Sequence, residues 1–132
     1  MKLNDYAVNV LPKLMVKELK IFELAAFKES HVSNILNAGN RRIDIGGVKK
    51  LELYGYAVNV LQKLKIGEDN KVEMFMLRKK EEDSMTNILS MGDGSIEVRR
   101  IQRNGFVVPE EIKPKLKYIL VYSAVVVPRK SS

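Results

Sequence analysis

The sequence contains no cysteine and no tryptophan, and it has a single histidine. Without cysteine, the chain can form neither a disulfide bond nor a thiolate metal site, and it has no thiol nucleophile. His31 is the one imidazole, and no base or metal partner for it is evident in the sequence, so we expect it to be structural. The fold must therefore be held together by packing alone.

Long hydrophobic runs are also missing. No apolar stretch approaches the roughly 20 residues of a membrane-spanning helix, and residues 1–11 lack the apolar centre of a secretory signal. The 132 residues include 45% hydrophobic and 30% charged side chains, which is typical of one globular domain. We expect a single soluble domain over residues 1–132, intracellular and either cytoplasmic or nuclear.

Positive charge is in excess and is unevenly distributed. The formal net charge is +7, and residues 97–132 hold eight basic and only three acidic side chains. Clustered lysine and arginine attract polyanions, because each neutralised phosphate releases condensed counterions. The last quarter of the chain therefore favours a nucleic-acid partner, whereas the alternative reading is that the charge only keeps the protein soluble.

The segment YAVNVL occurs twice, at 6–11 and at 56–61. Similar segments then follow both copies in the same order: an apolar run, SNIL or TNIL, and IDI or IEV, with a small charged insertion in the second copy. Ordered similarity of this kind is typical of internal duplication. We predict an internal repeat that covers 6–54 and 56–108.

Hydrophobic periodicity predicts an α+β fold, a mixed sheet with short helices built from two related halves. The apolar runs at 20–27 and 71–78 are predicted to be buried strands. A short helix is expected after each, because the apolar residues around SNIL and TNIL fall at i, i+3 and i+4. YAVNVL fits both a helical stripe and strand alternation; we favour a helix, and a strand would make the protein mostly β.

Two features are predicted for the C-terminal region. Asn104-Gly105 lies between SIEVRRIQ and FVVP and supplies the positive φ angles of a type I′ turn, which predicts a tight hairpin. Residues 116–127, LKYILVYSAVVV, are so apolar that we expect a long strand in the centre of a sheet. The methionines at 74, 76, 85 and 91 are expected to fill an irregular core.

Residues 41–130 follow the order β-α-β-α-β-β through RIDIGG, GYAVNVLQKL, VEMFMLR, DSMTNILSM, SIEVRRIQ and KYILVYSAV. This order and the run IGGVKKLELYGYAVNVLQKL resemble the Alba superfamily of small DNA- and RNA-binding proteins. In that family a strand ending in Ile-Gly leads to a lysine pair, which matches Lys49 and Lys50 here. The resemblance implies nucleic-acid binding and, because the family often works as dimers, a homo-oligomer.

The candidate binding residues are cations near the join of the two halves and in the last strands. Lys49 and Lys50 precede a predicted helix, whose free N–H groups add to their charge. Strand alternation places Arg99 and Arg103 on one face and Arg100 on the other. A strand pair of this kind can hold phosphates without reading bases. The predicted nucleic-acid-binding residues are Lys49, Lys50, Arg99, Arg100, Arg103, Lys113, Lys115 and Lys117.

Other chemistry is not indicated. The acidic residues at 81–83 adjoin Lys79 and Lys80 and are typical of a solvated helix start rather than of a metal site. The glycines at 46–47 and 92–94 lack the spacing of phosphate-binding loops. We predict no catalytic residue, no metal and no cofactor.

These observations favour a non-enzymatic protein that binds DNA or RNA through its phosphates, largely without sequence preference. The alternative is a structural or assembly subunit of a virus particle or large complex, working through protein–protein contacts. Nucleic-acid binding predicts an affinity that falls steeply with added salt, whereas an assembly subunit should form a discrete oligomer.

Overall fold

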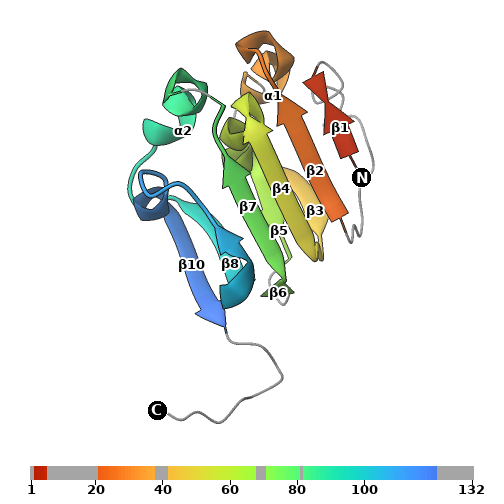
Figure 1. Ribbon diagram of the computed structural model, residues 1–132, viewed down its shortest axis with the longest axis vertical. Helices are drawn as coiled ribbons and strands as arrows, with labels where there is room; N and C mark the ends of the chain where they lie inside the picture. Colours follow the sequence, from red (N-terminus) through yellow and green to blue (C-terminus); the bar gives the residue numbers. More distant parts are fainter. Residues whose placement is uncertain (1, 6–20, 38–41, 68–70, 81, 122–132) are drawn as a thin grey trace.

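In the computed structural model of the protein, the described residues are 2–5, 21–37, 42–67, 71–80 and 82–121. Strands, short α-helices and 3-10 helices alternate along them (Figure 1). The predicted combination of strands with short helices is therefore confirmed.

The chain winds through repeated coils, each with a rising strand, a helical segment and a returning strand (Figure 1). After β1 (Lys2–Asn4), the elements are β2 (Ile21–Ala26), η2 (Glu29–His31), α1 (Ser33–Leu36) and β3 (Ile43–Gly46). The next coil has β4 (Lys50–Gly55), η3 (Tyr56–Lys63) and β5 (Leu64–Ile66). Then come β6 (Lys71–Val72), β7 (Met74–Arg78), η4 (Glu82–Met85), α2 (Thr86–Leu89) and β8 (Ile96–Gln102). The last described coil has η5 (Arg103–Gly105), β9 (Phe106–Val107), η6 (Lys113–Lys115) and β10 (Leu116–Val121).

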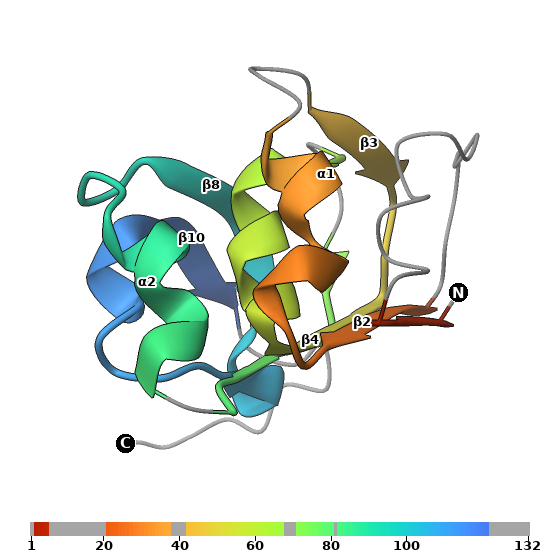
Figure 2. The ribbon, with the colours of Figure 1, turned by 90° about the horizontal axis from the view of Figure 1, so that it is seen from above.

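All the described strand pairs join neighbouring coils, and all of them are parallel. The rising strands form a five-stranded sheet in the order β1-β2-β4-β7-β9. The returning strands form a two-stranded sheet, β3-β5, and a three-stranded sheet, β10-β8-β6. The helical segments that follow β2, β4 and β7 lie at one end of the strands (Figure 1), and seen from above they stand in a row (Figure 2). The described part of the chain is thus a small solenoid, in which each coil packs on its neighbours.

The core lies inside the coils. Phe22, Leu51 and Phe75 occupy one register row of the first sheet, and all three are completely buried. Each such side chain contributes about 1.5–3 kcal/mol relative to an exposed position. Met74 and Met76 alternate with buried residues and lie on the outer face of this sheet, so the expectation that the methionines fill the core is wrong for them.

The second copy of YAVNVL is helical, as predicted, and forms most of η3. The first copy, at 6–11, lies outside the described residues. Asn59 in η3 is buried, and its side-chain amide joins this coil to the next one. Its Nδ2 donates to the carbonyl oxygen of Ser84 at 2.7 Å, and its Oδ1 accepts from the backbone N–H of Ile88 at 2.9 Å. A polar residue inside the apolar motif therefore holds adjacent helical segments together.

The structural repeat is shorter than the repeat in the sequence. Phe22 pairs with Leu51, Leu51 with Phe75, and Phe75 with Phe106, which gives separations of 29, 24 and 31 residues. SNIL in α1 and TNIL in α2 belong to coils that have η3 between them. One period of the sequence repeat therefore spans two coils of the described chain, and the division into two related halves stays a prediction.

The hairpin predicted for the C-terminal region is wrong, whereas the predicted C-terminal strand is confirmed over Leu116–Val121 but not in its central position. Arg103–Gly105 is a 3-10 turn, and β9 pairs in parallel with β7 rather than forming a hairpin with β8. Gly105 does not have a positive φ; glycine is needed there because a Cβ would overlap the carbonyl oxygen of Glu73 in the preceding coil. Among the described strands, β10 lies at the edge of its sheet and not in the centre. It is described as far as Val121, and residues 122–127 lie outside the described part.

Candidate functional site

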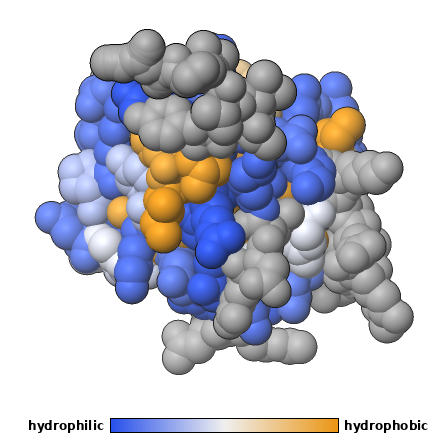
Figure 3. Space-filling model, turned by 90° about the horizontal axis from the view of Figure 1, so that it is seen from below, coloured by the Kyte–Doolittle hydropathy of each residue, from blue (hydrophilic) through white to orange (hydrophobic). Residues whose placement is uncertain are grey.

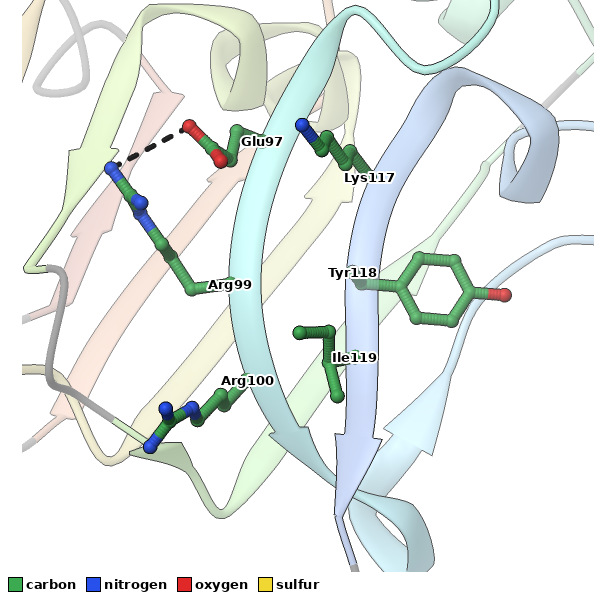
Figure 4. Close-up of a pocket in the computed structure, with 6 residues that line it drawn as sticks. All are labelled: Glu97, Arg99, Arg100, Lys117, Tyr118 and Ile119. Carbon is green, nitrogen blue, oxygen red and sulfur yellow. Dashed lines mark ion pairs between the residues drawn. The ribbon is translucent and has the colours of Figure 1, made fainter.

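A pocket of about 300 Å³ lies on the outer face of the β8 and β10 strands. Figure 4 shows that its charged side chains come from both strands. The lining residues are Glu97, Arg99, Arg100, Lys117, Tyr118 and Ile119. Three of them were predicted from the sequence as nucleic-acid-binding residues.

Strand register explains how the side chains of Lys117 and Ile119, both in β10, reach the pocket. Glu97 is the register partner of Lys117, and Arg100 is the register partner of Ile119. These residues are exposed, whereas Ile96 in β8 is buried in the core. Residues two apart on a strand share a face, so the outer face of β10 carries Lys117 together with Ile119.

A β-bulge in β8 brings Arg99 and Arg100 to the same surface. The register shifts between Lys117 and Tyr118, and Arg99 has a φ of 70°. An added residue in one strand resets its alternation. Val98 and Ile101, three residues apart, are consequently both buried, and Arg100 stays outside. The prediction that Arg99 and Arg100 lie on opposite faces is therefore wrong, because it assumed an uninterrupted strand.

Positive charge prevails in this pocket. Three cationic side chains line it together with one carboxylate, Glu97, whose Oε1 lies 3.5 Å from a guanidinium nitrogen of Arg99. An exposed ion pair of this kind contributes only about 0.2–1 kcal/mol, so it leaves the local excess of positive charge in place. A cleft lined mainly by one sign of charge concentrates counterions of the other sign.

Lys71 is a further cation beside the pocket, and sequence reasoning missed it. It lies in β6 and is the register partner of Arg100 in β8. The row Lys71, Arg100 and Ile119 therefore crosses the three-stranded sheet. Lys71 stands 29 residues from Arg100 in the sequence, in a region with nearly balanced charge. No local pattern could have joined the two.

The remaining predicted cations do not line the pocket. Three of them form ion pairs elsewhere: Lys50 with Glu52 at 3.1 Å, Lys113 with Glu110 at 2.9 Å, and Lys115 with Asp93 at 3.2 Å. Lys49 is exposed in the turn before β4, and Arg103 follows β8 in η5. The structure thus brings together Arg99, Arg100 and Lys117 out of the eight.

A second group of polar and charged residues lies on the outer face of the first sheet; the sequence analysis named its Lys50 but missed Glu52 and Tyr54. Glu52 is only 6% exposed, and the Tyr54 hydroxyl donates to its Oε1 at 2.6 Å. Burial raises the pKa of Glu52, but the hydrogen bond from Tyr54 and the contact with Lys50 together lower that pKa below its ordinary value. The hydrogen bond to Glu52, with burial, raises the pKa of Tyr54 to about 12. This group belongs to a different sheet from the pocket.

The sole histidine is also remote from the pocket in the fold. His31 is buried in η2, and its Nδ1 lies 3.3 Å from the Asp5 carboxylate, next to β1. Both elements belong to the first described coils, whereas the pocket is built from β8 and β10.

No family model matches the chain, and neither curated proteins nor solved structures yield a match. The resemblance to the Alba superfamily therefore stays a prediction. Throughout the described ranges, no helix combines the length and the hydrophobicity that crossing a lipid bilayer requires.

Proposed function

We propose that the protein binds nucleic acid without enzymatic activity, and that the pocket on β8 and β10 holds the phosphates. The observation that carries this proposal is the β-bulge, which sets Arg99 and Arg100 on the same outer face as Lys117. Five of the eight predicted cations are left out of the proposed site.

The side-chain types suit phosphate. A guanidinium presents a planar set of donors that can bind two phosphate oxygens at once, and the lysine ammonium adds a point charge. Ile119 supplies an apolar wall for a sugar or a base beside the charged groups, since its side chain is 61% exposed. Contacts of this kind hold a nucleic acid in place without reading its sequence.

The backbone at Arg99 also supports a binding role. A non-glycine residue in the left-handed region costs about 1–2 kcal/mol, and strained residues and bulges are frequent next to binding sites, where they redirect a side chain. The structure maintains this conformation at an arginine. Phosphate binding by the redirected Arg99 guanidinium is therefore the function that best explains why the unfavourable backbone conformation is kept.

The proposal predicts a salt-dependent affinity that pocket substitutions weaken selectively. Arg100→Gln/Lys117→Gln and Lys113→Gln/Lys115→Gln each remove two positive charges, but only the first pair lines the pocket. Fluorescence anisotropy with labelled single-stranded and duplex oligonucleotides, between about 50 and 200 mM salt, measures the slope of log affinity against log salt. The slope of the pocket variant should be shallower than that of wild type by about 1.4–1.8, because two phosphate contacts are lost. The slope of the control variant should stay close to that of wild type.

The result that would overturn the site is an equal loss in both variants, because binding would then follow net charge alone. Wild-type protein with no salt-dependent affinity for any of the probes would overturn the function itself. Circular dichroism of both variants separates a loss of contacts from a loss of fold.

A further inference from the structure

The strand β10 is an open edge of the solenoid. It is the outermost strand of the order β10-β8-β6, and within the described ranges it pairs only with β8. The peptide groups along its other side therefore have no partner strand there. An exposed edge six residues long is a template for another strand.

The end of β10 is also apolar on both faces. Ile119 is 61% exposed and Leu120 is 36% exposed. Consecutive residues of a strand point to opposite faces, so neither face is fully covered at this position. Seen from below, hydrophobic surface with hydrophilic surface on either side of it is visible left of centre, on the side of the molecule where β8 and β10 lie (Figure 3). Charged residues that normally protect an edge strand are limited to Lys117 in β10.

We propose that this edge pairs with the β10 edge of a second copy of the chain, antiparallel and about a two-fold axis perpendicular to the sheet. A two-fold contact uses the same surface on both molecules, so one contact closes both open edges and joins the two three-stranded sheets. Ile119 and Leu120 then pack near their own counterparts. Apolar surface and unpaired peptide groups are covered in the same step.

Charge selects the antiparallel arrangement. A parallel pair in register would place the two Lys117 side chains next to each other in molecules that each carry a net charge of +7. In an antiparallel pair centred on Ile119, so that Ile119 faces its own counterpart, the two lysines are about four residues apart along the strands, or roughly 14 Å. This exceeds the screening length of about 8 Å at physiological salt.

The dimer should be weak and dependent on concentration. One strand edge buries less than the roughly 800 Å² per partner that stable interfaces use. The dimer would also bring the two binding pockets together. Ile119 lines the pocket that contains Arg100 and Lys117, and the two-fold axis places the pockets of both copies on the same side of the joined sheet. The dimer is inferred from the strand edge alone, so it does not depend on nucleic-acid binding.

Sedimentation velocity without nucleic acid, from about 1 to 300 μM protein in about 150 mM salt, tests the proposal within the weak-affinity range. Ile119→Lys is the test variant, and Ile21→Lys makes the same change at an exposed isoleucine, 50% accessible, in β2. Wild type and Ile21→Lys should shift from monomer toward dimer as concentration rises, while Ile119→Lys stays monomeric.

Three results would overturn the inference: a wild-type monomer at every concentration, an equal loss of dimer in both variants, or growth beyond the dimer. The last would indicate head-to-tail stacking of coils instead of a closed two-fold contact. Thermal melting of both variants shows whether either has lost its fold. Because no nucleic acid is present, failure here leaves the phosphate site untouched, and failure of the salt titration leaves the dimer untouched.

Discussion

At the scale of single residues, the amide of Asn59 shows how a polar side chain can stabilise an apolar core. It is almost fully buried, yet its Nδ2 and Oδ1 both have backbone partners in the following coil. Burying an amide is costly unless its hydrogen bonds are made. Here the donors and the acceptor are used, and the direction of the bonds specifies how η3 meets α2.

We expect Asn59→Ala to destabilise the protein by at least about 2 kcal/mol, because it leaves the Ser84 carbonyl and the Ile88 N–H without this partner in the core. Urea unfolding followed by circular dichroism measures the loss. Asn34→Ala, at an exposed position in α1, is the control and should change stability by less than about 0.5 kcal/mol. Equal losses in the two variants would contradict the bridging role.

Tyr54 predicts a change of stability at alkaline pH. Its hydrogen bond to Glu52 raises the pKa of the hydroxyl from 10.0 to about 12 in the folded state. The resulting stabilisation is complete below pH 10 and is lost as the pH rises toward 12, because the folded state then also gives up the proton.

Tyr54→Phe should therefore be less stable than wild type at pH 8 to 9, and the difference should shrink as the pH approaches 12. Chemical unfolding at a series of pH values measures it. Tyr56→Phe removes a hydroxyl outside this pair and is the control. A difference between Tyr54→Phe and wild type that stays constant across this range would show that the Glu52 contact does not perturb the hydroxyl.

At the scale of elements, the bulge in β8 makes it possible to distinguish the contribution of a residue to stability from its contribution to binding. The left-handed backbone conformation of Arg99 is unfavourable for a residue with a Cβ, whereas Arg100 has ordinary extended backbone. Glycine adopts a positive φ freely, but in a regular strand it is unfavourable by about 0.5–1 kcal/mol. The same substitution at these neighbouring positions should therefore have opposite effects on stability.

Arg99→Gly should be as stable as wild type or more stable by up to about 1 kcal/mol, whereas Arg100→Gly should lose about 1 kcal/mol. Both variants lose one pocket cation, so both should bind nucleic acid more weakly at low salt. Denaturant unfolding and anisotropy on the same samples provide the two readouts. Destabilisation of Arg99→Gly as large as that of Arg100→Gly would show that the left-handed backbone at residue 99 is not strained.

At the scale of the whole molecule, stability comes from contacts between neighbouring coils. The parallel strands place residues 24 to 31 positions apart side by side, and glycine at 105 lets the turns approach closely. A solenoid of this kind has two ends, and each end exposes the edge of a strand. Such an edge is usually covered by another segment or protected from pairing by charged side chains. The open edge of β10 follows directly from this architecture.

The sequence by itself determined the local elements. The short apolar runs at 20–27 and 71–78 predict the strands β2 and β7, and the apolar stripe in YAVNVL predicts the helical segment η3, because these signals depend only on local composition and spacing. The basic C-terminal quarter supplied six of the eight predicted binding cations, and the structure places three of those six, Arg99, Arg100 and Lys117, around one pocket.

Tertiary structure alone decided which elements are neighbours. Asn104-Gly105 has the composition of a hairpin turn, yet the steric requirement comes from Glu73 in another coil, and no local pattern contains that contact. Lys71 joins Arg100 only through strand register, and Arg99 turns toward the pocket only because the core takes both Val98 and Ile101. Strand pairing between residues about 20 to 30 positions apart depends on how well whole coils pack against each other. No short stretch of the sequence contains that information.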